Sequence, residues 1–383
     1  MIIGVDIRVL GTGRMSGIEE YTEQLLAHMV PLDAAVQWKF FFAGTRPLAR
    51  RSWMELPNAR VYDTRISNRL LWARTWLTGR PHLDALVGGA DVFFFPHFIL
   101  GALSRDTRRV MTWHDLSYER MPELLSWHRR RWHDLQMRPR AQALASDHLI
   151  AVSRATADDM TLLYGIPSER VSVVHSGIDA QLRRASEQDI TQWRERQAID
   201  GPFVLALGTR EPRKNLVALV KAWDAMQSRG AVPRADLVLL GPDGWREDAL
   251  WRAIRATKEP RRVHCIGPAD AYDRACALSA ASVLAYPSLL EGFGFPPLEA
   301  MACGTPVVVG ATSSLFEVVG DAGILVDPYR VDSLTRALEA VLGDAGLRSH
   351  LAAKGFERAT HFTWRRAAEE TLKILIASAE RGR

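Results

Sequence analysis

Twelve short apolar runs recur along the chain and alternate with segments that have the spacing of helices. In the first half the runs are IIGVDI, WKFFFA, DVFFFP, RVMTW, HLIAVS and VSVVH; in the second half they are FVLALG, DLVLLG, RVHCIG, SVLAYP, PVVVG and GILVD. Buried strands that alternate with helices are typical of parallel sheets covered by helices. The sequence therefore predicts an α/β fold built on parallel strands.

The length of the chain and the distribution of the runs predict two domains. A chain of 383 residues is too long for one ordinary hydrophobic core. Residues 179–202 are polar and helix-forming, which indicates a linker near residues 178–200. We expect a doubly wound domain over residues 1–180, a second one over residues 200–362, and a final amphipathic helix over residues 363–383.

The composition favours a protein of the cytoplasm. Three cysteines, Cys265, Cys276 and Cys303, form no CxxC pair, which indicates a reducing compartment without disulfides or structural zinc. No run reaches the roughly 18 apolar residues of a membrane span. The opening MIIGVDIRVL has the pattern of a strand, so we expect no signal peptide.

Positive charge is concentrated between Arg46 and Arg80, where eight arginines accompany only two acidic residues. Within this segment, SNRLLWARTWLTGR interleaves Trp72 and Trp76 with arginines. One interpretation is a solvated helix whose tryptophans pack inward. The alternative is a basic, aromatic surface for an anionic membrane or a lipid-phosphate substrate. Nucleic acid is a third option, but the chain has no recognition motif for it.

The residues that follow each strand hold the information about ligands, because open parallel sheets bind ligands beyond the carboxyl ends of their strands. The first run is followed by GTGRMSGIEEY, a glycine turn into a helix that can present backbone N–H groups to a phosphate. This turn nearly matches the dinucleotide fingerprint GxGxxG, but Ser16 stands at the third glycine. The second run also lacks a following acidic residue, so NAD is disfavoured.

Polar residues follow three further runs. His97 comes after DVFFFP, and His114 and Asp115 come after RVMTW; they are either structural or part of a site at neighbouring strand ends. FVLALG is followed by TREPRKNL, in which Arg210, Arg213 and Lys214 suit a diphosphate. The alternative for these cations is a solvated basic turn.

Two glutamates flank a glycine turn in the stretch PSLLEGFGFPPLEAMACGTPVVVG. Pro296 and Pro297 suit the first turn of a helix that ends near Gly304, and Glu299 in that turn would be stabilised by the helix dipole without any ligand. Helix construction does not explain Glu291, which precedes the turn. The glycines of this turn would let the backbone approach a ligand closely.

The stretch EGFGFPPLEAMACGTPVV resembles the Glu-x7-Glu signature of retaining glycosyltransferases of family 4. The resemblance extends over nearly the whole chain, through GTGRMSGIEEY, WHDL, AVSRATADDM, VVHSGID, GTREPRKNL and the stretch from GPDGW to VDP. It implies the GT-B architecture of two Rossmann-like domains with an interdomain cleft. It also implies that the last helix crosses back to the first domain.

Carried over residue by residue, the resemblance implies a nucleotide-sugar site. Glu291 would bond hydroxyls of the donor sugar, Glu299 would hold the ribose, and Arg213 and Lys214 would neutralise the diphosphate, with His114 near the donor sugar and acceptor. The catalytic set is His114, Asp115, Arg213, Lys214 and Glu291, with His97 on the acceptor side. The donor-binding set is Gly13, Ser16, Gly17, Thr209, Gly241, Gly267, Gly292, Phe293, Gly294, Phe295 and Glu299.

The chain departs from the family pattern at one position. Many members have Gly-Arg where this chain has Gly208 and Thr209, so the first cation is missing although Lys214 keeps its spacing. Arg213, or else Arg210, would have to supply the second contact to the phosphates.

The resemblance implies transfer of a hexose with retention of configuration. The chain has no Asp-x-Asp pair, so we expect no metal site and no cofactor, the nucleotide sugar being a substrate. The motifs resemble those of bacterial mannosyltransferases of polysaccharide and O-antigen synthesis. This resemblance implies GDP-mannose as the donor and a lipid-linked saccharide as the acceptor, at the inner face of the plasma membrane. A UDP-sugar donor, a nucleotide-sugar epimerase of the same architecture and a non-catalytic binding protein are the alternatives.

Overall fold

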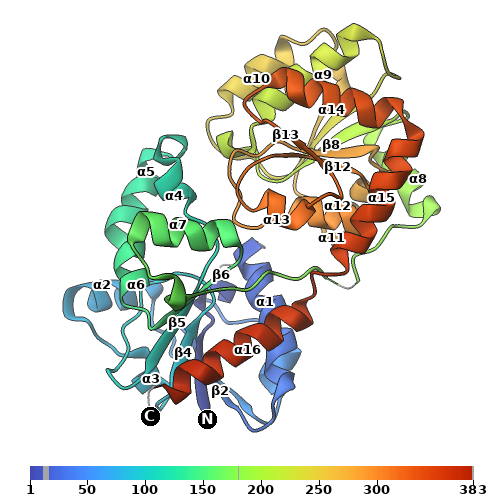
Figure 1. Ribbon diagram of the computed structural model, residues 1–383. Helices are drawn as coiled ribbons and strands as arrows, with labels where there is room; N and C mark the ends of the chain where they lie inside the picture. Colours follow the sequence, from blue (N-terminus) through green and yellow to red (C-terminus); the bar gives the residue numbers. More distant parts are fainter. Residues whose placement is uncertain (12–16, 180, 382–383) are drawn as a thin grey trace. The chain divides into compact units, whose positions relative to one another are not determined.

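The computed structural model describes residues 1–11, 17–179 and 181–381, and the chain divides into two compact units. The first unit comprises Met1–Gly177 together with Thr363–Arg383, and the second comprises Ile178–Phe362. Each unit is built on its own sheet, and every strand pair in both sheets is parallel. The α/β class with two Rossmann-like domains is confirmed (Figure 1).

The sheet of the first unit has seven strands in the order β3-β2-β1-β4-β5-β6-β7. Because the order reverses at β1, right-handed connections place the following helices on opposite faces of the sheet. The strands are β1 (Ile2–Asp6), β2 (Gln37–Phe42), β3 (Ala59–Asp63), β4 (Val92–Phe95), β5 (Arg108–Trp113), β6 (His148–Ala151) and β7 (Val171–Val173).

The helices of this unit begin and end at recognisable signals. Ser153 caps α7 by accepting a hydrogen bond from the backbone N–H of Thr156, and Gly165 ends that helix with a positive φ of 71°. The helices are α1 (Gly17–Met29), α2 (Asn68–Thr78), α3 (Leu83–Leu86), α4 (Ser117–Arg120), α5 (Trp127–Arg131), α6 (Pro139–Leu144), α7 (Arg154–Tyr164) and α16 (Trp364–Glu380). A π-helix, η5 (Trp132–Met137), joins α5 to α6.

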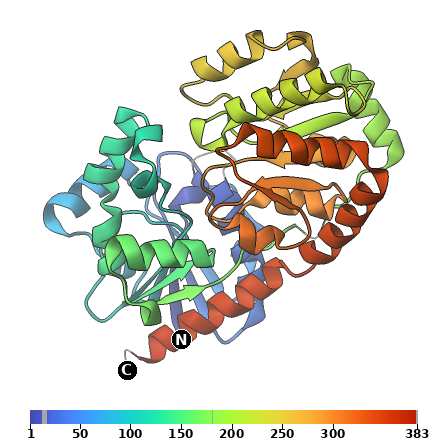
Figure 2. The same ribbon diagram turned by 45° about the horizontal axis from the view of Figure 1, so that its top comes forward.

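The C-terminal helix α16 packs on the first unit, against α1 and the strands β4 and β5 (Figures 1 and 2). Thr363 caps its first turn, and Trp364 is buried against the ring of Tyr21, with ring centroids 5.7 Å apart. The return of the last helix to the first domain, which the family resemblance implied, is confirmed.

The sheet of the second unit has six strands in the order β10-β9-β8-β11-β12-β13, which reverses at β8. The strands are β8 (Phe203–Leu207), β9 (Asp236–Leu240), β10 (Val263–Ile266), β11 (Val283–Tyr286), β12 (Val307–Gly310) and β13 (Ile324–Val326). The helices are α8 (Glu187–Gln197), α9 (Leu216–Arg229), α10 (Asp248–Arg255), α11 (Ala271–Ala280), α12 (Phe295–Ala302), α13 (Leu315–Val319), α14 (Val331–Gly343) and α15 (Ala345–Ala359).

All twelve apolar runs of the sequence form strands, and the structure adds β3, which the sequence did not predict. β3 lies at the edge of its sheet, where its one partner among the described strands is β2. Its residues, ARVYD, are half-buried or exposed, and two of the five are charged, so they form no continuous apolar run. A half-covered edge strand has less need of apolar side chains than a central strand.

The segment expected as a linker folds as part of the second unit. It contains α8, in which Ser186 caps the first turn and Trp193 is 1% exposed, and this helix packs against α11. The segment is polar overall because most of its residues lie on the exposed face of an amphipathic helix. Its buried residues are too few to predict from the sequence that the helix packs on a domain.

We predict that Gly177→Ala destabilises the junction with α16. An added Cβ would lie 2.0 Å from the backbone nitrogen of Trp364, which cannot move without displacing the helix. Overpacking of this kind costs about 1–3 kcal/mol. Calorimetry should show a melting temperature several degrees lower than that of the control Gly201→Ala, where the nearest atom is 4.0 Å away. Equal melting temperatures for both variants would contradict this.

Candidate active site

A group of buried and half-buried charges in the second unit lies at the carboxyl ends of β8 and β11. These strands are neighbours, so the residues that follow them meet at one edge of the sheet. The chain after β8 forms a short 3-10 helix, Pro212–Lys214, and the loop after β11 carries Glu291. The backbone nitrogen of Leu289 donates to the carbonyl of Arg213, which joins the two loops.

Glu291 binds two cations at once. Its Oε2 lies 2.7 Å from Arg213 Nη1 and its Oε1 lies 2.8 Å from Lys214 Nζ. Arg213 also donates from Nη2 to Glu211 at 2.6 Å and from Nη1 to the carbonyl of Leu290 at 2.6 Å. The cluster thus pairs two cations with two carboxylates, and it is close to neutral as a whole.

Tyr286, the last residue of β11, completes this cluster. Its hydroxyl accepts a hydrogen bond from Lys214 Nζ, which also lies 4.6 Å from the centre of the tyrosine ring. The sequence analysis did not single out Tyr286. It is the last residue of the run SVLAYP before the proline, and its polar tip at a strand end was the available signal.

Burial and pairing act on the ionisation of these groups in opposite directions. Burial alone would raise the pKa of Glu291, but the charges of Arg213 and Lys214 lower that pKa to about 2. Burial lowers the pKa of Lys214, against the opposing effect of Glu291, and raises the pKa of Tyr286 well above its usual value. At neutral pH the cluster therefore holds an ionised Glu291 beside a neutral phenol.

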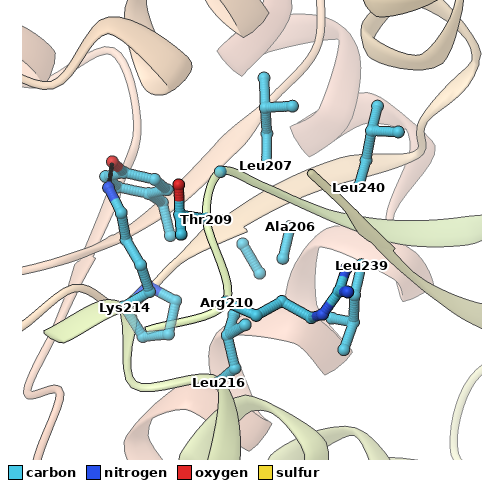
Figure 3. Close-up of a pocket in the computed structure, with 12 residues that line it drawn as sticks. Ala206, Leu207, Thr209, Arg210, Lys214, Leu216, Leu239 and Leu240 are labelled. Atoms are coloured by element: carbon cyan, nitrogen blue, oxygen red, sulfur yellow. Dashed lines mark hydrogen bonds between the residues drawn. The ribbon is translucent and has the colours of Figure 1, made fainter. Parts of the chain in front are cut away.

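Arg210 does not join this cluster. It is 6% exposed, its Nη1 donates to the carbonyl of Gly241 at 2.8 Å, and it forms ion pairs with Asp243 and Glu247. Figure 3 shows its side chain extending away from that of Lys214, toward Leu239. Of the two arginines that could replace the missing cation, the structure brings Arg213 to Lys214 and uses Arg210 to hold the Gly241–Trp245 turn.

A small hollow with a volume of about 10 Å³ lies beside the cluster (Figure 3). Thr209 and Lys214 contribute polar groups to its wall, and most of the remaining lining is apolar. The lining residues are Ala206, Leu207, Gly208, Thr209, Arg210, Lys214, Leu216, Leu239, Leu240, Ala285, Tyr286 and Pro287.

Gly241, in the loop after β9, is required by close approach. Gly241 has a φ of 144°, and a Cβ there would lie 2.3 Å from the carbonyl oxygen of Gly208. The loops after β8 and β9 therefore pack backbone to backbone beside the hollow. Gly267, after β10, is exposed with open space around it, so its part in donor binding stays a prediction.

Two serines form hydrogen bonds to the backbone of the loop between Glu291 and Glu299. Ser313 Oγ accepts from the backbone nitrogen of Glu291 at 2.8 Å, and Ser314 Oγ donates to the carbonyls of Glu291 and Phe293 at 3.0 and 2.7 Å. The Phe293 ring is buried, 5.2 Å from the ring of Phe295. Their side chains therefore serve packing, and a role in donor binding would fall to their backbone and that of Gly292.

Glu299 lies in α12, which Gly294 begins with a φ of 113°. The carboxylate is 3% exposed and contacts a different cation, Arg274 of α11, at 3.1 Å. A buried carboxylate beside an arginine is more than the helix dipole requires, which favours a ligand role for Glu299.

In the first unit, His97 and His114 lie together at the ends of the neighbouring strands β4 and β5, with ring centroids 5.8 Å apart. His114 Nε2 lies 2.9 Å from the carbonyl of Pro96, and His97 Nδ1 is buried without a hydrogen-bond partner among the described residues. Burial lowers the pKa of both histidines. Neutral rings of this kind can exchange hydrogen bonds with sugar hydroxyls.

For the remaining predicted site residues, the structure shows local contacts for Asp115 and Gly17 but does not describe Gly13 and Ser16. Asp115 accepts from the backbone nitrogen and hydroxyl of Ser117 at 2.9 and 2.7 Å, so its visible role is to hold a turn. Gly17 begins α1, with open space where a Cβ would stand. Gly13 and Ser16 lie outside the described residues.

No group of three or more His, Cys, Asp or Glu side chains in the described part of the chain could hold a metal ion. Across residues 1–11, 17–179 and 181–381, no helix has the length and apolar character needed to cross a membrane.

Comparison with known proteins gives matches over both units. Residues 15–182 match Glycosyltransferase Family 4, and residues 189–358 match Glycosyl transferases group 1. The chain is 31% identical over 297 residues to O-antigen chain mannosyltransferase B of Escherichia coli, covering 76% of this chain and 74% of that protein. It is 32% identical over 243 residues to D-inositol 3-phosphate glycosyltransferase of Salinispora tropica, covering 60% of this chain and only 50% of that protein.

Solved structures share the fold. Sucrose-phosphate synthase from Thermosynechococcus elongatus superposes with a TM-score of 0.73 at 21% identity, over 97% of this chain and 98% of that one. Anabaena HepE in complex with UDP and glucose gives a TM-score of 0.69 at 18% identity, over 98% and 100%. With both family matches and the E. coli relative in agreement, this chain belongs to glycosyltransferase family 4 and is a glycosyltransferase.

Proposed function

We propose that this glycosyltransferase moves mannose from GDP-mannose to a saccharide acceptor, with retention of configuration and without a metal ion or cofactor. The choice of mannose is supported by the E. coli relative, whose name is that of an O-antigen chain mannosyltransferase and of which this chain covers 74%. A lipid-linked acceptor in cell-surface polysaccharide synthesis fits the same relative. Such an acceptor would place the reaction on the cytoplasmic face of the plasma membrane.

The cluster of Arg213, Lys214 and Glu291 is the observation that carries the proposal. A departing nucleoside diphosphate needs positive charge, which a transferase without metal must supply from side chains. Arg213 offers a fork of donors and Lys214 a compact charge, both at the carboxyl end of β8 where ligands of parallel sheets bind.

Glu291 has a second role in this proposal. Its carboxylate bonds both cations before the donor arrives, at 2.7 and 2.8 Å. A diphosphate that binds the same cations competes with Glu291 and releases it toward the sugar hydroxyls. Glu291 is then a binding residue, and the departing phosphate itself helps to deprotonate the acceptor hydroxyl.

The donor and the need for metal are tested together. The chain is incubated with GDP-mannose or UDP-glucose and a lipid-linked saccharide acceptor, with and without EDTA, and the product anomer is read by NMR. We expect transfer from GDP-mannose that survives EDTA and gives the α-anomer. Transfer from the UDP-sugar alone, loss of activity in EDTA, or an inverted product would each overturn the corresponding part of the proposal.

We predict that Glu291→Gln binds free GDP more tightly while transferring sugar more slowly. The substitution removes a negative charge beside two cations, so GDP no longer competes with it, and affinity should rise on the order of tenfold. Turnover should fall about a hundredfold, because the amide cannot replace the carboxylate at the sugar. Calorimetric titration and steady-state kinetics check both effects.

Glu259→Gln serves as the control, since Glu259 pairs with Arg234 on the surface of the same unit. Neither GDP affinity nor turnover should change in this variant. A fall in GDP affinity in Glu291→Gln, in a protein that circular dichroism shows to be folded, would show that Glu291 is not a competitor of the diphosphate.

A further inference from the structure

Two helical segments of the first unit lie side by side and expose apolar side chains. They are α2 and the continuous stretch of α5 and η5, which occupy the same end of the unit in both views (Figures 1 and 2). The indole nitrogen of Trp72 in α2 donates to the carbonyl of Gln136 in η5 at 2.9 Å. We call their outer surface the basic aromatic face; its apolar members are Leu70, Trp76, Leu77, Trp127, Trp132 and Leu135.

These six side chains are half of the twelve large apolar side chains that are exposed among the described residues. Leu77 is 72% exposed and Trp127 is 61% exposed. Both segments are already anchored from within, because Leu71 of α2 and Met137 of η5 are buried in the core of the unit. The exposed members are thus surplus to what folding of this unit requires, and exposed apolar side chains that gather on two neighbouring segments mark an interaction surface.

The charge on the same segments is almost entirely positive. Residues 64–83 contain four arginines and no acidic residue, and residues 125–146 contain five arginines and one acidic residue, Asp134. Arg69, Arg74, Arg130 and Arg131 are exposed on the two segments. The centre of a protein–protein interface is usually depleted of charge, whereas interfacial membrane helices combine tryptophan, leucine and arginine.

The exposed leucines and tryptophans distinguish between two possible anionic partners, a nucleic acid and a phospholipid bilayer. A nucleic acid would use the arginines but would gain little from exposed leucines. A bilayer uses all three side chains, because arginines meet anionic headgroups while the tryptophan and leucine side chains enter the boundary with the acyl chains.

The inner side of η5 connects this face to the histidines at the strand ends. The ring of His133 stacks on that of Tyr118 at 4.5 Å, and it lies 6.0 Å from Phe98, whose ring is 4.3 Å from that of His97. The short π-helix thus exposes Trp132 outward and contacts the surroundings of His97 inward. Segments of this kind are frequent at functional sites.

We propose that the basic aromatic face docks this chain on an anionic phospholipid surface and so brings a membrane-anchored acceptor to the strand ends at which His97 and His114 lie. The purpose of docking rests on the proposed lipid-linked acceptor. The docking itself does not, because it depends only on the side chains of α2, α5 and η5.

The test measures sedimentation of the full chain with vesicles, without donor or acceptor. We expect binding to an equimolar mixture of phosphatidylcholine and phosphatidylglycerol, weakened by high salt, and little binding to phosphatidylcholine alone. Because each arginine near such a surface contributes roughly a fivefold gain, Arg69→Ser with Arg74→Ser should weaken binding about thirtyfold. Trp76→Ser with Leu77→Ser should weaken it at both low and high salt.

The matched controls are residues that do not belong to the face. Arg252→Ser with Arg255→Ser removes two exposed arginines from α10, and Leu162→Ser removes an exposed leucine from α7, and both should leave vesicle binding unchanged. No binding to anionic vesicles, equal losses in face and control variants, or tighter binding to single-stranded DNA than to vesicles would each overturn the proposal.

Transfer assays separate this inference from the proposed reaction. The face variants should transfer sugar to a detergent-free, lipid-free saccharide at the unaltered rate and to a lipid-linked saccharide in vesicles at a reduced rate. If no sugar is transferred to either acceptor but the vesicle results hold, the proposed reaction fails and the docking surface stands.

Discussion

The carboxylate of Glu291, buried between Arg213 and Lys214, is the interaction on which the candidate site depends. The two cations and the two carboxylates of the cluster, Glu291 and Glu211, neutralise one another in a site with little solvent, and removing one of them would leave an uncompensated buried charge. The same arrangement gives a diphosphate a place to bind, since it can take over the role of the carboxylate. Stability of the free protein and binding of the donor are thus in competition for the same two cations.

The fold brings these groups together by a simple rule of parallel sheets. Because β8 and β11 are neighbours at the point where the strand order reverses, their following loops meet, although Lys214 and Glu291 lie far apart in sequence. Supporting contacts then fix the loops: Ser313 and Ser314 hold the backbone around Glu291, and Tyr286 holds Lys214. Arg210 ties the turn after β9 to the same edge. Each of these contacts sets the position of a group and needs no ligand to form.

Much of the fold could be predicted from the sequence, because central strands buried on both faces must be apolar throughout. The edge strand β3 was not predicted, since a half-exposed strand needs no continuous apolar run. The burial of Trp193 was not predicted either, because the helix around it is otherwise polar. Site residues within recognisable motifs, such as Glu291 and Lys214, were also accessible from the sequence. The sequence could not show that Arg213 pairs with Glu291 whereas Arg210 does not. Both arginines lie in one short loop, and only three-dimensional contacts assign their partners.

A double-mutant cycle tests most directly whether Glu291 and the donor compete for the same cations. GDP affinity is measured by calorimetric titration for the wild-type chain, Lys214→Ala, Glu291→Gln and the double variant. If the carboxylate acts through Lys214, the gain in affinity that Glu291→Gln produces in the wild-type background should shrink strongly when Lys214 is absent. An equal gain in both backgrounds would show that Glu291 acts on GDP independently of Lys214 and would contradict the competition.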